Sequence, residues 1–434
     1  MKKRILALLL AGVMALGLAA CSDGGQGESQ APDTTSTTPA DSNESTPADS
    51  TGSAASEIKV GAIMLHDENS GYDMAHIEGL TTACENLGID MSQVTIRYNI
   101  PEDENCYDAA ADLADAGCDI IFSDSYGHQT YMMQAALEFP DVTFVSCTGD
   151  QAGASQQPNL KNIFPYTYES RYVSGVVAGM KLKELMDAGT VTDPKIGYVG
   201  AYPYAEVVSG YTAFLLGIQS IVPEAYMEVQ YTNSWYDLTK ENETALALMN
   251  DGCVIIGQHA DSTGAPSAVQ AEHENGKTVF SVGYNIDMLA VAPDVALTSA
   301  QNVWSVLYQA TLEAYLEGGN DAVPADYACG AAEGAQTISA LGPACAEGTA
   351  EKVEEVWAAL ADGSLKVFDT SKFTVDGATV DSYQVDLSIT DFASGDVIYQ
   401  GQVVDAISDG AFQESVYRSA PYFDLRIDGI TELN

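Results

Sequence analysis

Apolar and polar positions alternate along residues 57–434 in a regular way: short apolar runs are followed by segments whose apolar residues recur at helical spacing. The run 58–65 is rich in Ile and Val, which predicts a buried parallel strand. A polar loop follows over residues 66–73, and apolar residues between 74 and 87 fall on one helical stripe. Because ligands bind at the carboxyl ends of strands in open α/β sheets, we expect residues 66–73 to form one wall of a binding cleft.

The same alternation continues in two successive series, which predict βαβ units with parallel sheets. The first series has strands at 93–98, 117–123 and 142–146, with helices at 106–116 and 130–139. A crossover through 162–164 leads to a helix at 172–185, and the second series has strands at 195–200, 226–232, 253–257 and 279–282, with helices at 207–220, 238–250 and 265–275. Two doubly wound halves of similar size, each with polar and aromatic residues at its strand ends, are typical of a bilobal clamp.

The rest of the chain is predicted to recross between the halves. A strand at 295–298 and a helix at 303–317 would return to the first lobe, and 335–339 to the second, before an amphipathic helix at 352–362. Strand-like alternation around Asp376 and Gly377 predicts a hairpin-like elaboration. We therefore expect a first lobe of residues 57–165 plus 286–325 and a second lobe of residues 166–285 plus 326–434, with the β-rich elaboration near 370–405.

The beginning of the chain has the pattern of an exported lipoprotein. Residues 1–4 are basic, 5–18 are apolar, and small residues precede Cys21. This pattern resembles a bacterial lipobox, so we expect residues 1–20 to be a signal peptide and Cys21 to be lipidated, which anchors the protein on the extracytoplasmic face of the cell membrane. The alternative is an ordinary signal peptide with an incidental cysteine. Residues 21–56 are polar and acidic without apolar periodicity, which predicts a disordered tether.

Composition and motifs exclude several classes of protein. A formal net charge of −45 repels nucleic acid and anionic lipid headgroups, which argues against both as partners. No G-x-S-x-G elbow, P-loop or G-x-G-x-x-G after a strand is present, so we do not expect an enzyme. The sequence contains neither a C-x-x-C pair nor an H-x-x-x-H spacing, which would indicate a metal site. No cofactor is expected. Nothing suggests an obligate oligomer, so we expect a monomer.

The seven cysteines after Cys21 leave one structural alternative open. In an oxidising compartment one disulfide could form, either Cys329–Cys345 or Cys84–Cys106. Three others, Cys118, Cys147 and Cys253, lie in or beside apolar strands, where a free cysteine behaves as a small buried hydrophobe.

Several of these segments resemble the basic membrane protein family of ABC-importer substrate-binding lipoproteins, which includes purine nucleoside receptors. The matching segments are 69–73 (Asn-Ser-Gly-Tyr-Asp), 78–80, 169–179, 258–262, 283–288 and 297–304. The resemblance covers about residues 57–368 and 417–429. It implies a type I periplasmic-binding-protein-like fold of two parallel-sheet lobes joined by a multi-strand hinge. It also implies a purine nucleoside or base as ligand, with an ABC permease and its ATPase as partners.

The resemblance has two departures that concern the ligand. The nucleoside receptors tend to carry an Asp where this chain has Asn285, and a Lys after the Thr-Ser motif has no counterpart that we can place. In that family these residues help to hold ribose. A free purine base, or another flat heterocycle such as a flavin, therefore stays open.

A planar purine needs flat π-faces on both sides and hydrogen-bond partners around its edge. Tyr72 matches the residue that stacks on the base in the family, and the other stacking candidates are Tyr202, Trp235 and Tyr236. Asp73 and Asp237 are interpreted as helix caps. The polar candidates at strand ends are His66, Asp67, Asn69, Asp124, Ser125, Gln258, His259, Asp261, Asn285 and Asp287.

The prediction from the sequence is thus a tethered receptor that closes around a purine nucleoside or base and delivers it to a permease. One alternative keeps the fold and changes the ligand to riboflavin, a sugar or a signalling molecule. Another is a ligand sensor for a membrane kinase. A nucleoside hydrolase is a third alternative.

Overall fold

The computed structural model describes residues 55–390 and 396–434 of the 434-residue chain. The predicted signal peptide at 1–20, Cys21 and nearly all of the tether lie outside the described residues. In the part that is described, no helix combines the length and the apolar character needed to cross a membrane.

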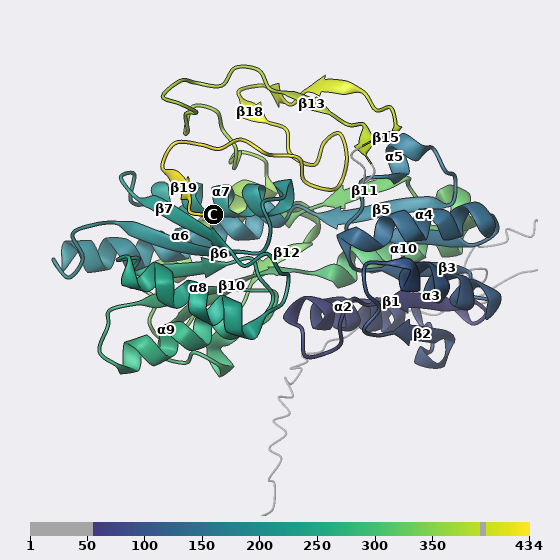
Figure 1. Cartoon of the computed structure of the whole chain (residues 1–434), viewed down its shortest axis with the longest axis horizontal. Helices are drawn as coiled ribbons and strands as arrows, with labels where there is room; N and C mark the ends of the chain where they lie inside the picture. The colour runs from purple at the N-terminus through teal and green to yellow at the C-terminus, as the bar shows by residue number, and fades with distance from the viewer. Residues whose placement is uncertain (1–54, 391–395) are drawn as a thin grey trace, which may run out of the picture. The chain divides into compact units, whose positions relative to one another are not determined.

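Two sheets organise the body, one for each lobe (Figure 1). The first sheet has six strands in the order β11-β5-β4-β3-β1-β2, all parallel, and the second has seven in the order β12-β10-β9-β8-β6-β7-β19, in which β12 alone pairs antiparallel. The first-sheet strands are β1 (Val60–Ile63), β2 (Val94–Arg97), β3 (Ile120–Ser123), β4 (Thr143–Ser146), β5 (Leu160–Pro165) and β11 (Asp326–Cys329). The second-sheet strands are β6 (Lys195–Gly200), β7 (Tyr226–Tyr231), β8 (Ile255–Gln258), β9 (Phe280–Tyr284), β10 (Ala296–Asn302), β12 (Gln336–Ile338) and β19 (Ile430–Glu432).

Helices cover both faces of the first sheet, because successive residues of its buried strands point to opposite sides. Val60 and Ala62 pack with α2 (Gly71–Leu87) and α10 (Trp304–Gly318), whereas Ile63 and Ile121 pack with α3 (Glu104–Asp115) and α4 (Gln129–Glu138). The hydroxyl of Ser70 caps the start of α2 by accepting from the backbone N–H of Asp73 at 3.4 Å. The short helix α5 (Ala152–Ser155) precedes β5.

In the second lobe, α6 (Thr167–Asp187) and α7 (Ala205–Gln219) pack closely against each other. Two glycines permit this approach: a Cβ added to Gly175 would lie 2.2 Å from the carbonyl oxygen of Phe214, and one added to Gly217 would lie 2.1 Å from that of Tyr172. The remaining helices of this lobe are α8 (Leu238–Asn250), α9 (Gly264–Glu274) and α11 (Thr349–Ala361).

The chain passes between the lobes three times, from β5 to α6, from β10 to α10 and from β11 to β12. The side chain of Asn302, at the end of β10, joins all three passages. Its Oδ1 accepts hydrogen bonds from the Thr167 hydroxyl at 3.1 Å and from Nε2 of Gln336 at 2.8 Å. These three side chains are buried, so the bonds are shielded from water.

Two strands correct the lobe boundaries expected from the sequence. β10 falls in the range 286–325 expected for the first lobe, but it pairs with β9 in the sheet of the second lobe. The chain therefore crosses to the first lobe after β10 and not before it. β11 falls in the range 326–434 expected for the second lobe, but it pairs with β5. Its sequence, Asp-Tyr-Ala-Cys, has no run of large apolar residues that would predict a strand.

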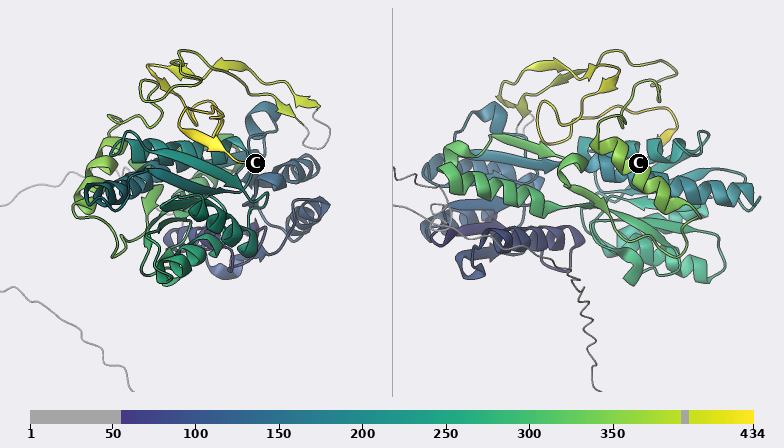
Figure 2. Two further views of the ribbon diagram at one scale, coloured as in Figure 1. Left: turned by 60° about the vertical axis from the view of Figure 1, so that its left-hand side comes forward. Right: turned by 180° about the vertical axis from the view of Figure 1, so that it is seen from behind.

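The C-terminal elaboration consists of small antiparallel pairs (Figure 2). The side chain of Tyr399 packs against the core of the first lobe, whereas Val385, Ala406 and Phe412 belong to the core of the second lobe. The strands are β13 (Gln384–Asp386) with β16 (Val403–Asp405), β14 (Ile389–Thr390) with β15 (Val397–Tyr399), and β17 (Ile407–Ser408) with β18 (Ala411–Phe412). Stacking of Phe368 on Phe423, with centroids 4.4 Å apart, joins it to the hydrophobic core of that lobe. The expected turn at Asp376–Gly377 is flanked by a bridge between Val375 and Ala378.

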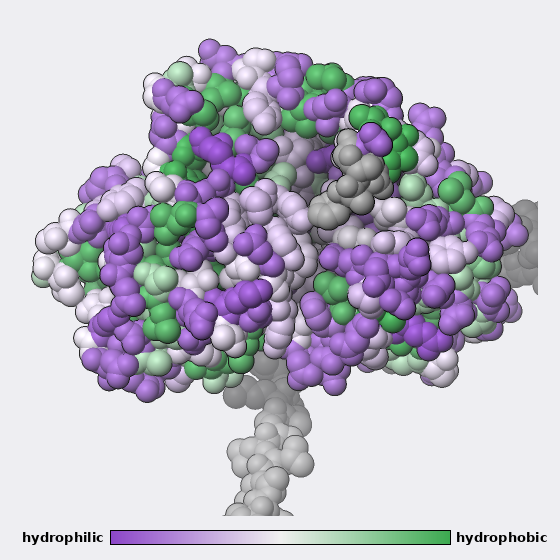
Figure 3. All heavy atoms as spheres, in the orientation of Figure 1, coloured by the Kyte–Doolittle hydropathy of each residue, from purple (hydrophilic) through white to green (hydrophobic). Residues whose placement is uncertain are grey.

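All seven described cysteines are free, so the structure contains neither Cys329–Cys345 nor Cys84–Cys106 as a disulfide. Cys118, Cys147 and Cys253 are buried, as predicted. The face seen in Figure 3 is mostly hydrophilic, with hydrophobic residues in scattered patches.

A buried carboxyl group in the C-terminal segment makes stability depend on pH. Burial raises the pKa of Glu414 to about 8, although hydrogen bonds from Ser209 and from the backbone of Tyr422 oppose the increase. Glu414 keeps its proton in the folded state and loses it in the unfolded state between its ordinary pKa and pH 8. The free energy of unfolding should therefore fall by up to about 1.4 kcal/mol per pH unit as pH rises through this range.

Glu414→Gln should remove this contribution, because an amide of the same shape does not ionise. We expect the thermal midpoints of the two proteins to coincide near pH 4, with the variant more stable at pH 8, as measured by calorimetry across the range. Parallel pH profiles would contradict the assignment.

Candidate functional site

A cavity of about 390 Å³ lies between the two lobes at the carboxyl ends of the strands. The first lobe contributes Leu65, His66, Tyr72, Asp73, Ser125, Tyr126 and Thr148, and the second contributes Glu206, Trp235, His259, Asp261 and Tyr284.

Tyr72 is held rigidly in the first-lobe wall. Its hydroxyl donates to the carbonyl oxygen of Asp124 at 2.8 Å and lies 2.8 Å from the hydroxyl oxygen of Thr148. Its ring lies edge-on to His76, with centroids 4.5 Å apart. Burial lowers the pKa of His76 to about 3, so this imidazole is neutral and packs as an aromatic ring. These contacts hold the ring of Tyr72 in one orientation.

Two carboxyl groups near Tyr72 have pKa values that are shifted in opposite directions. Burial alone would raise the pKa of Asp73, but hydrogen bonds from His66 and Asp124 lower it to about 2. Burial and the charge of Asp73 raise the pKa of Asp124 well above its usual range. Asp73 is therefore ionised at neutral pH, whereas the protonated form of Asp124 is favoured. The backbone N–H of His66 donates to Oδ1 of Asp73 at 2.6 Å, which fixes the loop after β1.

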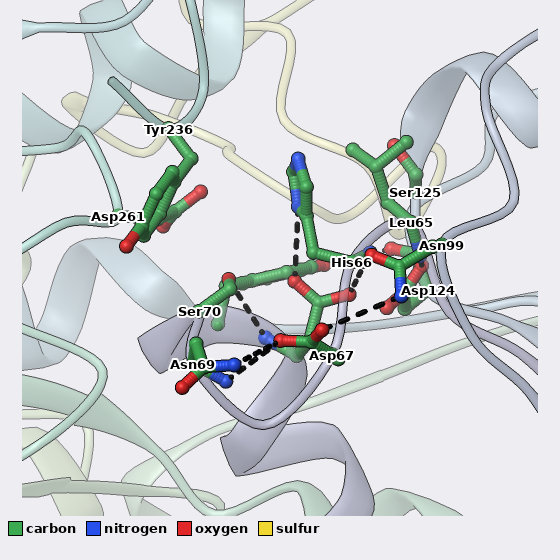
Figure 4. A network of polar contacts seen from close by, with 12 residues as sticks. Leu65, His66, Asp67, Asn69, Ser70, Asn99, Asp124, Ser125, Tyr236 and Asp261 are labelled. Atoms are coloured by element: carbon green, nitrogen blue, oxygen red, sulfur yellow. Dashed lines mark hydrogen bonds and ion pairs between the residues drawn. The ribbon is translucent and has the colours of Figure 1, made fainter. Parts of the chain in front are cut away.

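Asp261 forms the opposing wall (Figure 4). Its Oδ1 accepts from Nδ2 of Asn285 at 2.9 Å, and its backbone N–H donates to the carbonyl oxygen of Trp235 at 2.8 Å. Burial, with the nearby Glu241, raises the pKa of Asp261 well above its usual range. Figure 4 shows Asp261 and Tyr236 facing His66, and the rings of Tyr236 and His66 lie 5.8 Å apart across the two lobes.

A buried arginine supports the second-lobe wall from behind. The guanidinium of Arg171 lies 3.6 Å from the ring centroid of Tyr284 and donates to the carbonyl oxygen of Gln258 at 2.6 Å. Burial and this positive charge lower the pKa of His259 to about 4. Neutral His259 lies with Nε2 3.3 Å from Oε1 of Glu206. Tyr284 therefore lines the cavity while its ring is in contact with a buried cation.

Of the residues predicted from the sequence, the structure brings six to the cavity: His66, Tyr72, Ser125, Trp235, His259 and Asp261. Eight others are not in its lining: Asp67, Asn69, Asp124, Tyr202, Tyr236, Gln258, Asn285 and Asp287.

The residues outside the lining have local structural roles in the described part of the chain. Asp67 accepts from the backbone and side chain of Asn69, so these two form a turn. Nε2 of Gln258 donates to the carbonyl oxygens of Ala260 and Ser262, which shapes the loop after β8. Asp287 is exposed and accepts from the backbone N–H of Leu289 at the start of a 3₁₀ turn. Tyr202 stacks on Tyr204 at 5.1 Å behind Trp235.

The sequence reasoning missed Leu65, Asp73, Tyr126, Thr148, Glu206 and Tyr284. Asp73 was interpreted as a helix cap, but Ser70 caps α2 and the Asp73 carboxylate turns back to His66. Thr148 follows the end of β4, and a single threonine there carries no signal that separates it from other loop residues.

The lining is suited to holding a small planar molecule. Tyr72, Tyr126, Trp235 and Tyr284 supply aromatic surface, and the carboxyl groups of Asp73, Glu206 and Asp261 supply acceptors. Across the described residues, no group of three or more His, Cys, Asp and Glu side chains is placed to hold a metal ion.

Comparisons with known proteins identify the family of the chain. A model of the Bmp family, described as ABC transporter substrate-binding protein PnrA-like, matches residues 62–353. The chain is 34% identical over 266 residues to a purine-binding protein of Brucella abortus, covering 61% of this chain and 71% of that protein. It is also 34% identical over 205 residues to a putative ABC transporter glucose-binding protein of Haloferax volcanii, covering 47% of this chain and 48% of that protein.

Among solved structures, ABC transporter solute-binding proteins of Conexibacter woesei and Aeropyrum pernix have TM-scores of 0.55 and 0.59 at 22% and 17% identity. The matches cover 71% and 72% of this chain and 98% and 93% of those proteins. They confirm the predicted type I periplasmic-binding-protein-like fold.

The family match extends over well more than half of the chain and confirms the resemblance seen in the sequence. Solute-binding proteins of this kind bind small molecules for ABC transporters outside the cytoplasm, and they are not a class of enzymes. The chain therefore belongs to the Bmp family of PnrA-like ABC transporter substrate-binding proteins.

Proposed function

We propose that this protein binds a purine nucleoside or purine base in the cavity between its lobes and delivers it to an ABC permease. The observation that carries the proposal is the pairing of aromatic rings with carboxyl groups from opposite lobes. Tyr72 and Asp73 come from the first lobe, and Trp235 and Asp261 come from the second. A flat ligand would lie between rings that only a closed clamp brings together.

The polar groups of the cavity match the edge of a purine. The exocyclic amine and ring N–H groups of a purine donate hydrogen bonds, which the ionised Asp73 can accept. The raised pKa of Asp261 favours its protonated form, and a protonated carboxyl group can donate to a ring nitrogen. The hydroxyls of Ser125 and Thr148 add groups that donate or accept. The Brucella abortus relative is named as a purine-binding protein, which supports the same class of ligand.

A sugar is the second candidate for the ligand. It is supported by the Haloferax volcanii relative, which is named as a putative ABC transporter glucose-binding protein. Sugars also combine an apolar ring face with hydroxyl donors, so aromatic rings and carboxylates could serve them as well.

The proposal also includes a lipid anchor, a tether and the transporter proteins that the receptor meets. Cys21, once lipidated, would anchor the protein, and residues 21–56 would tether the body to the membrane. The partners would be a permease and its ATPase, met by a monomeric receptor.

The proposal is tested by thermal-shift measurements and calorimetry on the purified protein with purine bases, purine nucleosides, riboflavin and simple sugars. A ligand that binds only the folded state raises the thermal midpoint, by about 2.7 kcal/mol of stabilisation at a concentration of 100 Kd. We expect a purine to do so and glucose not to. Stabilisation by a sugar or by riboflavin alone would replace the purine assignment and leave the clamp intact.

A further inference from the structure

Residues 414–424 form a strap between the two lobes, and the strap lies beyond the family match, which ends at residue 353. On the second lobe the strap is held by buried contacts. Phe423 belongs to the hydrophobic core, and the buried carboxyl group of Glu414 accepts from the backbone N–H of Tyr422 at 3.2 Å. After the strap the chain continues into β19, which pairs with β7 in the second-lobe sheet. The strap is therefore a fixed part of the second lobe.

The part of the strap that reaches the first lobe is held by its own hydrogen bonds. The hydroxyl oxygen of Tyr422 accepts from the backbone N–H groups of Val416 at 3.1 Å and Tyr417 at 3.3 Å. The guanidinium of Arg418 donates to two backbone carbonyl oxygens of the strap, at 3.3 and 3.4 Å. Arg418 is thus oriented within the strap itself, which reduces the conformational entropy that it loses when it meets a partner.

Polar contacts join the strap to the first lobe. Nη1 of Arg418 forms an ion pair with Oδ2 of Asp150 at 3.2 Å, and the backbone N–H of Ser419 donates to Oδ1 of Asp326 at 2.9 Å. Asp150 is kept in position because its backbone N–H donates to Oε1 of Gln129 at 2.8 Å. The side chains of Arg418 and Asp150 are 18% and 14% exposed, so salt screens this ion pair less than a pair on the open surface.

Open space adjoins these contacts on the first-lobe side. One chamber of about 850 Å³ lies between α5 and residues 400–402, and another of about 870 Å³ lies between Thr148 and the strap. The ring of Tyr399 adds one apolar contact with the first-lobe core. Among the described residues, the strap thus has an apolar core on its second-lobe side and polar contacts beside open chambers on its first-lobe side. The first-lobe contacts are therefore the ones that break when the lobes move apart.

Tyr126 connects these contacts to the cavity between the lobes. Its hydroxyl donates to Oδ2 of Asp150 at 3.1 Å, and the same oxygen pairs with Arg418. Tyr126 also lines the cavity, and its ring centroid lies 6.2 Å from that of Tyr204 on the second lobe. A molecule in the cavity would lie against the side chain that bonds to the first-lobe partner of the strap.

We propose that the strap holds the lobes in the closed form and slows the release of a bound ligand, with Arg418 and Asp150 as the pair that must separate before the cleft opens. The inference goes beyond the proposed function, since it concerns the opening of the cleft and applies to any small molecule in the cavity. A contact that exists only in the closed form is lost on opening, so removing it acts mainly on the dissociation rate.

The first test follows the opening of the cleft without a ligand. Small-angle X-ray scattering should give a larger radius of gyration for Arg418→Gln and for Asp150→Asn than for the unmodified protein, because the closed form loses stability. Arg426→Gln is the matched control, since Nε of Arg426 pairs with Oε1 of Glu432 at 2.9 Å within the second lobe. Its radius should stay unchanged. Thermal midpoints verify that all variants fold.

The second test measures release of adenosine, inosine and adenine by stopped-flow fluorescence of Trp235, which lines the cavity. Arg418→Gln and Asp150→Asn should each raise the dissociation rate constant about fivefold to tenfold. The double variant should release these ligands no faster than either single variant, because the ion pair is already lost in each. Arg426→Gln should release them at the unmodified rate.

The outcomes separate this inference from the proposed function. An unchanged radius of gyration in Arg418→Gln and Asp150→Asn would show that the strap does not hold the closed form. Effects of the two substitutions on release that add in the double variant would show that they act independently and not through their ion pair. If no purine binds, the proposed function fails, and the scattering measurement still decides whether the strap holds the lobes together.

Discussion

Replacing Tyr72 with alanine is expected to weaken purine binding by about tenfold to a hundredfold, because stacking on one aromatic ring contributes roughly 1–3 kcal/mol per base. The effect should be large because the ring is already fixed. Its hydroxyl is bonded to the Asp124 carbonyl oxygen and its edge packs against His76, so little conformational entropy is lost when a ligand stacks on it. Calorimetry with the ligand identified in the screen gives the change in dissociation constant.

Tyr72→Phe is the matched control. It keeps the ring and removes only the hydroxyl, and the Asp124 carbonyl oxygen still accepts from Thr148 at 2.6 Å. We expect its affinity to stay within about threefold of the unmodified protein, or about 0.7 kcal/mol. Equal losses in the two variants would show that the hydroxyl and not the ring carries the interaction. Circular dichroism and the thermal midpoint verify that both variants fold.

Gly217→Ala is expected to destabilise the second lobe by about 2–3 kcal/mol, even though alanine is favoured over glycine in a helix by about 1 kcal/mol. The intrinsic preference is outweighed by a clash, because the new Cβ would lie 2.1 Å from the backbone carbonyl oxygen of Tyr172. A backbone atom cannot move aside as a side chain can, so α6 and α7 must separate. A drop in the thermal midpoint measures the effect.

Gly153→Ala provides the control for this substitution. Gly153 lies in the short helix α5, and a Cβ added there meets no atom within 4 Å. We expect its stability to change by less than about 0.5 kcal/mol, as for surface substitutions in general. If Gly217→Ala were as harmless as Gly153→Ala, the close contact of α6 and α7 would not limit stability.

The order of strands and helices could be predicted from the sequence because buried parallel strands are continuous apolar runs. The runs that became β3, β6 and β8 are of this kind. β11 and β19 have no such run, since they lie at or near a sheet edge and are only partly buried. Tertiary pairing, which the local pattern does not contain, creates these strands.

The candidate site could be located to strand ends but not to individual side chains. His259 and Asp261 reach the cavity. The side chain of Gln258, the last residue of β8, instead donates a hydrogen bond to the carbonyl oxygen of Ala260. Similarly, Tyr284 faces the cavity, and the next residue, Asn285, has a positive φ of 63° that directs its amide to Asp261. A single residue decides which side of a strand a side chain occupies, and loop geometry after the strand decides the rest.

The amide of Asn302 has a mechanical consequence. Two bodies joined by one flexible link can tilt, twist and slide, whereas parallel links remove most of these motions. Here Thr167 and Gln336 each donate a hydrogen bond to Asn302, so one side chain on each passage is held at the same point. We therefore expect the three passages to move as a unit when the cleft opens, and the residues that face each other across it to return to the same register when it shuts.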